Sequence, residues 1–236
     1  GAGRLWASGM MGSPTATLSD RALHWDHALE EPFDVAILGG GISGSCHYDT
    51  LCRRGYRVLL VDRKDFAGGT SQASGMMVWG GLLYLRQLDL ATVFRLSRSR
   101  DRMLRDLGDR VRVCSYRYIP SHSTGLEQTL LAAALRAYWL LGGGNRTKST
   151  FERDFPEQEL LNEGVSRSSF RIEEACLNSS DSRFVLSWIT PHGPPSGSAL
   201  NHCDIIEGHL DLPSQHWLLQ LKDGITGAEG QAQARI

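Results

Sequence analysis

The sequence lacks several features that would assign it to a specialised class of protein. It has no excess of charge of one sign, since 25 Lys and Arg face 26 Asp and Glu. A chain this close to neutral has no strong field to attract nucleic acid, so we expect none as a partner. No stretch has the roughly eighteen uninterrupted apolar residues of a membrane-spanning helix. The richest run, at 130–141, contains Arg136 and is predicted to be a buried helix.

Cysteine is scarce and irregularly spaced. No two of the five cysteines form a C-x-x-C pair; they are Cys46, Cys52, Cys114, Cys176 and Cys203. An odd number with this spacing argues against a disulfide scaffold and against a zinc site, and it suits a reducing compartment. We therefore expect no metal centre.

The two ends of the chain have little pattern. Residues 1–30 show no clear period and no compact signal-peptide core, and are predicted to form a poorly ordered tail. The final "QAQARI" is typical of the beginning of a strand, so we expect the chain to be an N-terminal fragment. With 236 residues and 41% hydrophobic content, it is long enough to bury a sizeable core.

A strand, helix and strand pattern starts at Phe33. "FDVAILGG" is a short apolar run that ends in glycine, as in a strand buried on both faces. The next stretch, 41–56, has the length of a helix, and "RVLLVDRKD" at 57–65 is a second apolar run. The three elements together have the size of one βαβ unit.

Three glycines form G-x-G-x-x-G between the first strand and the helix. Gly39 permits a tight turn, Gly41 lets the backbone approach a pyrophosphate, and Gly44 lets the helix pack closely on the strand. The helix N-terminus adds unpaired N–H groups and partial positive charge. Asp62 ends the second strand, where its carboxylate can accept hydrogen bonds from a ribose and disfavours the 2′-phosphate of NADP. The pattern predicts a dinucleotide site but does not separate FAD from NAD.

The remaining elements are less clear. Residues 88–108 are predicted to form an amphipathic helix, with the arginines at 95, 98, 100, 102 and 105 on a solvated face. A capping box at Thr124–Glu127 predicts a second helix that ends at the glycines 142–144. Residues 145–170 are expected to be a polar exposed excursion, and 181–189 fits either a helix or a strand.

Three strands are expected near the C-terminus, with "DGITG" as the hairpin connection between the last two. No catalytic residue is assigned. His122, His202 and Cys203 have no accompanying triad order or nucleophile-elbow motif, so we expect them to be surface or packed residues.

Residues 34–85 resemble the N-terminal part of the FAD-dependent glycerol-3-phosphate dehydrogenases, which belong to the wider flavoprotein group that includes D-amino-acid oxidase. The most specific part is "GTSQASGMMVWGGLLYL", similar to that family's G-T-S-x-x-S-x-K-L-I-H-G-G-L-R-Y-L. Weaker similarity continues to residue 236. The resemblance implies FAD as cofactor.

The resemblance also assigns roles to individual residues. The pyrophosphate would be held by the glycine loop and the start of the helix: Gly39, Gly41, Ile42, Ser43 and Gly44. Asp62 and Arg63 would bind the adenosine end. The residues that would lie along the cofactor or bring backbone near the flavin ring are Thr70, Ser71, Ser74, Gly80, Gly81 and Leu82. Tyr84 is the one candidate substrate residue.

Three positions depart from the family pattern. Met76 replaces a lysine, Trp79 a histidine and Leu83 an arginine that helps bind the substrate's phosphate. A leucine cannot donate the charged, bidentate hydrogen bonds that suit a phosphate dianion. A less charged or more apolar alcohol or amine is therefore at least as good a candidate substrate as glycerol 3-phosphate.

We predict an α/β fold in which a Rossmann-like FAD-binding domain is interrupted by a partial substrate-cap segment. Its parts are a tail at 1–30, FAD-binding segments at 31–110 and 185–236, and the cap segment at 111–184. The expected function is oxidation of a small alcohol by hydride transfer to flavin. The alternatives are an amine or hydroxy-acid oxidase, an NAD-dependent dehydrogenase and a non-catalytic dinucleotide-binding protein.

Partners and location follow from the same resemblance. A small-molecule substrate and an electron acceptor, a quinone or another compound, are expected. Family members can associate with a membrane surface, although the sequence shows no anchor. The predicted location is the cytoplasm or the inner face of the membrane.

Overall fold

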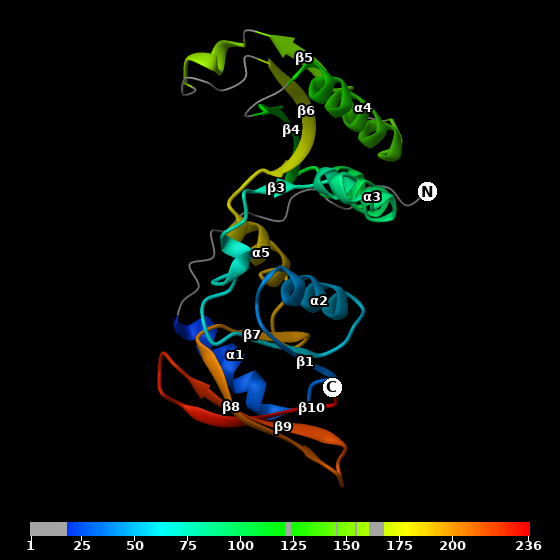
Figure 1. The fold of residues 1–236 in the computed structure, drawn as a ribbon. Coiled ribbons are helices and arrows are strands. Elements are labelled where there is room, and N and C mark those ends of the chain that lie inside the picture. The colour runs from blue at the N-terminus through cyan, green and yellow to red at the C-terminus, as the bar shows by residue number, and fades with distance from the viewer. Residues whose placement is uncertain (1–17, 121–123, 145, 154, 161–167) are drawn as a thin grey trace, which may run out of the picture. The chain divides into compact units, whose positions relative to one another are not determined.

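A computed structural model describes residues 18–120, 124–144, 146–153, 155–160 and 168–236. The chain divides into two compact units (Figure 1), one of residues up to 71 with 185–236, the other of residues 72–184. The sequence predicted the first boundary after residue 110. Residues 72–110 instead group with the second unit, because their helix α3 (Leu90–Asp106) contacts the elements that follow it.

The first unit contains a three-stranded parallel sheet. The strands β1 (Val35–Leu38), β2 (Val58–Val61) and β7 (Gly197–Leu200) lie in the order β1-β2-β7. Helix α2 (Ile42–Arg53) connects β1 to β2. The predicted βαβ unit and the α/β fold class are therefore confirmed.

Strand β2 is buried on both faces, as the sequence predicts. Val58 and Leu60 pack in a cluster with residues of α2 and of the last part of α5 (Asp181–Ile189). Leu59 and Val61 point to the other face and pack with residues of a second sheet. The alternation follows from the period of two in a strand.

The second sheet of this unit is antiparallel. It consists of β8 (Cys203–Asp211), β9 (His216–Asp223) and β10 (Glu229–Ala234), in the order β10-β9-β8. The three C-terminal strands and the hairpin between the last two are thus confirmed.

Part of the predicted N-terminal tail is a helix. Residues 1–17 lie outside the described residues, but Leu18–Glu30 form α1, so the prediction is wrong for them. Arg21 holds this helix on the unit with hydrogen bonds of 2.9 and 3.0 Å to Asp223 and of 2.7 and 2.8 Å to Asn201. The partners lie 180 or more positions away, so local periodicity gave no sign of them.

The Arg21–Asp223 ion pair predicts a pH-dependent stability. Burial by itself would raise the pKa of Asp223, but hydrogen bonds from Arg21 and from the backbone N–H groups of Ile225 and Thr226 lower it to about 2. Because the pKa is lower in the folded chain, this contribution is present above about pH 4 and is lost as the pH falls through about 2. Arg21→Ala is therefore expected to cost about 2 kcal/mol at pH 7 and progressively less between pH 4 and pH 2.

Urea unfolding across this pH range measures the effect. Lys222→Ala is the matched control, because Lys222 forms an exposed ion pair with Glu229, and should cost less than about 0.5 kcal/mol throughout. An Arg21→Ala loss that does not change with pH would contradict the assignment.

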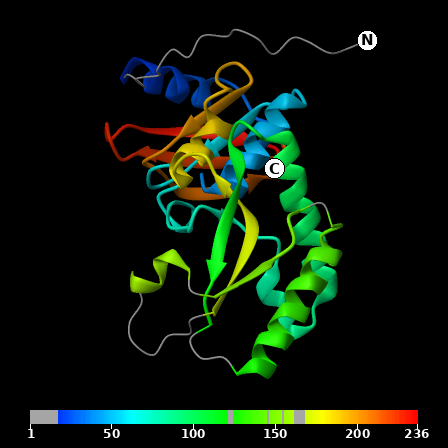
Figure 2. The same cartoon turned by 90° about the horizontal axis from the view of Figure 1, so that it is seen from above.

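The second unit is built on an antiparallel sheet. Strands β3 (Met77–Val78), β6 (Ser168–Leu177) and β4 (Val111–Tyr118) lie in the order β3-β6-β4, and β5 (Thr150–Arg153) pairs with β6. Helices α3 and α4 (Gly125–Leu141) lie on one side of this sheet (Figures 1 and 2). The predicted capping box at Thr124 and Glu127 is present.

Short 3₁₀ turns complete the two units. They are η1 (Thr70–Gln72), η2 (Leu82–Gln87) and η3 (Pro156–Leu160). The excursion expected at 145–170 is only partly irregular, because β5 and the beginning of β6 fall within it and Phe155 is buried. The ambiguous stretch 181–189 is the helix α5.

Two further predictions are wrong in the second unit. Arg100 was expected on a solvated face but is only 1% exposed, because it pairs with the buried Glu174. Cys114 and Cys176 were expected to be unpaired, whereas the structure joins them in a disulfide. They lie on the paired strands β4 and β6, and a separation of 62 residues in the sequence does not reveal this.

Candidate functional site

The glycine-rich crossover, which is the loop at residues 39–41 together with the start of α2 up to residue 44, has the backbone geometry that its sequence predicts. Gly39 has φ +107°, in the region where L side chains are strained. Its N–H donates to the carbonyl of Val61, which links the loop to β2. A Cβ built at Gly44 would lie 1.9 Å from the Gly39 carbonyl oxygen, so only glycine lets α2 pack this closely on β1.

Asp62 ties the end of β2 to the loop. Its Oδ2 accepts a hydrogen bond of 2.7 Å from the N–H of Gly40, and its Oδ1 accepts one of 2.8 Å from the N–H of Lys64. Each carboxylate oxygen keeps a further lone pair. Asp62 therefore fixes the turn and still offers acceptors to a ligand hydroxyl.

A pocket of about 320 Å³ opens beside Asp62 at the carboxyl edge of the parallel sheet. It is lined by residues at the ends of β1 and β2 and the start of β8: Leu38, Gly39, Val61, Asp62, Arg63, Cys203, Asp204 and Ile205. In open α/β sheets, ligands bind at this edge. The structure thus brings Gly39, Asp62 and Arg63 together around one cavity.

The sequence did not assign Cys203, Asp204 or Ile205 to this pocket. The available signal was the third parallel strand, because its carboxyl end lies at the same edge as those of β1 and β2. Burial raises the pKa of the Cys203 thiol to about 11, so it is protonated at neutral pH. Cys203 is a packed residue with no nucleophilic character, as expected.

The start of α2 presents backbone N–H groups beside a serine hydroxyl. The N–H of Ile42 donates to Ser71 Oγ at 3.0 Å, and a Cβ built at Gly41 would lie 3.0 Å from the same oxygen. Ser43 lies in the first turn of the helix, and Thr70 lies beside Ser71 in η1. Gly41, Ile42 and Ser71 therefore form a close-fitting cradle at the positive end of the helix.

The other predicted site residues belong to the second unit. The Ser74 hydroxyl donates to Asp181 and accepts from the N–H of Met76. Gly80 is enclosed by buried polar groups, and Gly81 has φ +91° and precedes η2, in which Leu82 and Tyr84 lie. The structure groups these residues apart from the glycine crossover, in the unit of residues 72–184.

The three residues that differ from the family pattern lie at exposed positions. Met76 is 46% exposed, Trp79 is 43% and Leu83 is 63%. None of the three belongs to the buried core of the described residues. Tyr84, at 42%, is exposed in the same way.

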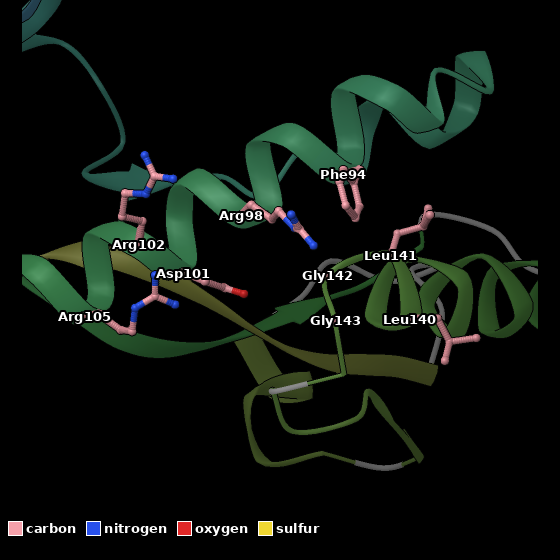
Figure 3. A pocket seen from close by; sticks show the side chains of 9 residues that line it. All are labelled: Phe94, Arg98, Asp101, Arg102, Arg105, Leu140, Leu141, Gly142 and Gly143. Carbon is pink, nitrogen blue, oxygen red and sulfur yellow. The ribbon is translucent and has the colours of Figure 1, made fainter.

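A pocket larger than the one beside Asp62 lies in the second unit, between α3 and the end of α4 (Figure 3). Its volume is about 560 Å³, and three arginines of α3 line it: Arg98, Arg102 and Arg105. The Arg98 guanidinium lies 4.2 Å from the centre of the Phe94 ring. No predicted site residue lines this pocket, so its size does not make it the cofactor site.

The part of the chain that the structure describes has neither a metal-ligand cluster nor a membrane-spanning helix. Among the described residues, no group of three His, Cys, Asp or Glu side chains is arranged to hold a metal ion. Within the same ranges, no helix has the length and apolar content to cross a bilayer. His202 is exposed, and His122 lies outside the described residues.

Comparison with known proteins agrees with the fold and the glycine crossover. Residues 34–169 match the DAO family model, described as FAD dependent oxidoreductase. Glycerol-3-phosphate dehydrogenase 2 of Mycobacterium bovis is 34% identical over 166 residues, covering 68% of this chain and 28% of the relative. The aerobic glycerol-3-phosphate dehydrogenase of Staphylococcus haemolyticus is 27% identical over 211 residues, covering 87% and 37%.

Solved structures show the same fold at low identity. Glycerol-3-phosphate dehydrogenase from Bacillus halodurans, complexed with FAD, superposes with a TM-score of 0.61 at 18% identity over 92% of this chain and 35% of that one. L-proline dehydrogenase from P. horikoshii gives 0.58 at 12% identity over 88% and 52%.

The chain spans about a third of the length of the curated relatives. The resemblance to the glycerol-3-phosphate dehydrogenases that the sequence predicts is confirmed by these relatives. Because the matched region contains the glycine crossover and covers more than half of the residues, this chain belongs to the DAO family of FAD-dependent oxidoreductases.

Proposed function

We propose that this chain binds FAD and belongs to an enzyme that oxidises a small alcohol. The observation that supports the proposal is the glycine loop itself, in which Gly39 has a positive φ, Gly44 has no room for a side chain and Asp62 lines an open pocket. Membership of an FAD-dependent family favours FAD over NAD as the dinucleotide.

The residues present fit the cofactor. A Cβ built at Gly39 would have no atom within 4 Å, so this side of the loop is open to a ligand. Gly41, Ile42, Ser43 and Gly44 would hold the pyrophosphate against the α2 N-terminus, where backbone N–H groups and the helix dipole favour anions.

Asp62 and Arg63 would bind the adenosine end in the pocket that they line. Thr70, Ser71 and Ser74 would contact the middle of the cofactor, and the backbone of Gly80, Gly81 and Leu82 would lie near the flavin ring. When bound, FAD supplies a ring that accepts a hydride and passes the electrons on.

The proposed substrate class rests on the exposed residues that differ from the family pattern. Leu83 cannot pair with a phosphate, and Met76 supplies no charge either. These two side chains favour a small alcohol that is less charged than glycerol 3-phosphate, with an amine or a hydroxy acid as the second candidate. A quinone or another acceptor would receive the electrons, in the cytoplasm or at the inner face of the membrane.

Anaerobic bleaching of the flavin absorbance at about 450 nm tests the substrate class. The FAD-loaded chain is mixed with glycerol, glycerol 3-phosphate, lactate and glycine. We expect glycerol to bleach it at a lower concentration than glycerol 3-phosphate does, and Leu83→Arg to reverse that order. Bleaching by glycine alone would overturn the alcohol assignment, and loaded protein that none of them bleaches would support a non-catalytic dinucleotide-binding role.

A further inference from the structure

The pocket between α3 and the end of α4 is lined by more positive than negative side chains (Figure 3). Arg98, Arg102 and Arg105 lie on one face of α3, because residues three and four positions apart on a helix are neighbours. All three are exposed, and in the part of the chain that the structure describes none forms an ion pair with a carboxylate. Among the same residues, Asp101 is the only acid that lines the pocket.

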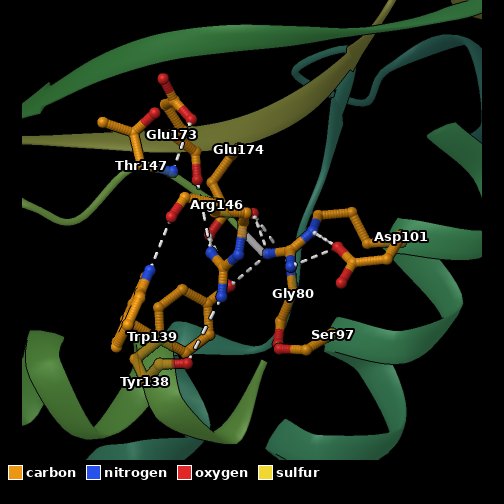
Figure 4. A network of polar contacts seen from close by, with 10 residues as sticks. Gly80, Ser97, Asp101, Tyr138, Trp139, Arg146, Thr147, Glu173 and Glu174 are labelled. Atoms are coloured by element: carbon orange, nitrogen blue, oxygen red, sulfur yellow. Dashed lines mark hydrogen bonds and ion pairs between the residues drawn. The ribbon is translucent and has the colours of Figure 1, made fainter. Parts of the chain in front are cut away.

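Asp101 belongs to a network of charges that balance one another (Figure 4). Its Oδ1 accepts hydrogen bonds of 3.0 Å from Arg100 Nε and of 2.6 Å from Arg100 Nη2. Arg100 Nη1 donates to Glu174 Oε2 at 2.9 Å, and Arg146 Nη1 lies 3.7 Å from Glu174 Oε1. Two arginines therefore balance two carboxylates, and the charges of the three lining arginines remain uncompensated.

The same network joins the two walls of the pocket. Arg100 is a buried residue of α3, and its Nη1 donates to the Tyr138 hydroxyl of α4 at 3.0 Å. The Tyr138 hydroxyl in turn donates to Glu174 Oε1 on β6. A pocket whose walls are fixed before a ligand arrives loses less conformational freedom when the ligand binds.

The end of α4 carries less negative charge than a helix C-terminus without a cationic neighbour. The last carbonyl groups of a helix bear a partial negative charge, which repels an anion. Arg146 Nη2 donates to the carbonyl of Tyr138 at 3.3 Å, and a Cβ built on Gly142 would lie 2.4 Å from the same nitrogen. The guanidinium of Arg146 thus offsets part of that charge next to the pocket.

Apolar side chains complete the lining of the pocket. Phe94, Leu140 and Leu141 lie beside the arginines, and the Arg98 guanidinium lies 4.2 Å from the centre of the Phe94 ring. The ring restricts the positions that this guanidinium can take. The volume of about 560 Å³ is within the range of small-molecule sites. A ligand with an organic part as well as several negative charges fits this lining.

We propose that this pocket binds a small organic compound that carries a diphosphate group. Each guanidinium can donate two parallel, charged hydrogen bonds to phosphate oxygens, and three of them can neutralise the several negative charges of a diphosphate. The site goes beyond the proposed function, because none of the residues assigned to FAD lines this pocket.

Calorimetric titration with inorganic diphosphate and with ADP tests the proposal. Saturating FAD is present, because the α2 N-terminus of the glycine-rich crossover also suits phosphates. We expect one diphosphate to bind per chain, ADP to bind at least as tightly, and Arg102→Ala or Arg105→Ala to weaken both about tenfold. Arg95→Ala is the matched control, because Arg95 is an exposed arginine of α3 that does not line the pocket, and it should leave both affinities unchanged.

Three results would overturn the proposed site. They are the absence of binding in the presence of FAD, an equal loss of affinity in Arg95→Ala and Arg102→Ala, and binding of diphosphate without binding of ADP. Arg102→Lys keeps the charge without the paired donors, so it should weaken binding less than Arg102→Ala does. A chain that binds no FAD but loses diphosphate affinity in Arg102→Ala would overturn the proposed function and leave this inference intact.

Discussion

Replacing Gly44 with alanine is expected to abolish stable FAD binding and to lower the free energy of unfolding by about 3 kcal/mol. The added Cβ would lie 1.9 Å from the carbonyl oxygen of Gly39 and 3.3 Å from the Ile37 side chain. The 1.9 Å contact is with backbone, so α2 has to move away from β1. That movement would withdraw the N–H groups at the start of the helix from the phosphate position.

Urea unfolding and FAD titration measure the two parts of this effect. Gly125→Ala is the matched control, because a Cβ at Gly125, the first residue of α4, would meet no atom within 4 Å. It should leave both FAD affinity and stability nearly unchanged. If Gly44→Ala binds FAD with wild-type affinity, the glycine-rich crossover does not bind the cofactor.

Replacing Arg100 with leucine is expected to cost about 3 kcal/mol, because the buried Glu174 carboxylate loses its charged partner at 2.9 Å and keeps only Arg146, whose Nη1 lies 3.7 Å from Glu174 Oε1. Glu174 is 1% exposed, so water cannot replace the guanidinium without opening the unit. The Tyr138 hydroxyl would lose a donor at the same time. The hydrogen bond from the N–H of Gly80 to Glu174 Oε2 should be lost together with the stability.

Two variants separate the buried pair from general effects on α3. Arg98 lies on the same helix at an exposed position. Arg98→Ala should therefore change the free energy of unfolding by less than about 0.5 kcal/mol. The double variant Arg100→Leu with Glu174→Leu removes both charges and should recover part of the stability. Equal losses in Arg98→Ala and Arg100→Leu, measured by urea unfolding, would contradict the role of the buried pair.

Local patterns predicted much of the first unit. The alternating burial of β2, the helix that starts after Gly41 and the hairpin between β9 and β10 all follow from short-range rules of periodicity and turn chemistry. The capping box of α4 was predicted for the same reason, since its two partners lie three residues apart.

Contacts between distant segments were not predictable from the sequence. Arg100 and Glu174 are 74 positions apart, so the arginine pattern of α3 indicated a solvated face and gave no sign of a buried partner. The same holds for Arg21 with Asp223 and for the disulfide between β4 and β6. Each depends on strand and helix packing that no single window of the sequence contains.

The residues of the candidate site also divide into those with a local sequence signal and those without one. Gly39, Gly44 and Asp62 were predicted because a dinucleotide loop needs those residue types at that spacing. Ile205 and Asp204 were missed because their place in the pocket depends on where β8 begins relative to β2. The contacts assigned to Thr70, Ser74 and Leu82 remain predictions from the family resemblance.

The most direct measurement is the cofactor content of the purified chain after incubation with equal concentrations of FAD and NAD and removal of unbound ligand. We predict a yellow protein that absorbs at about 450 nm and releases FAD in a stoichiometric amount on acid treatment, with no NAD retained. A colourless protein that retains NAD, or one that retains neither dinucleotide, would contradict the assignment of the glycine crossover to FAD.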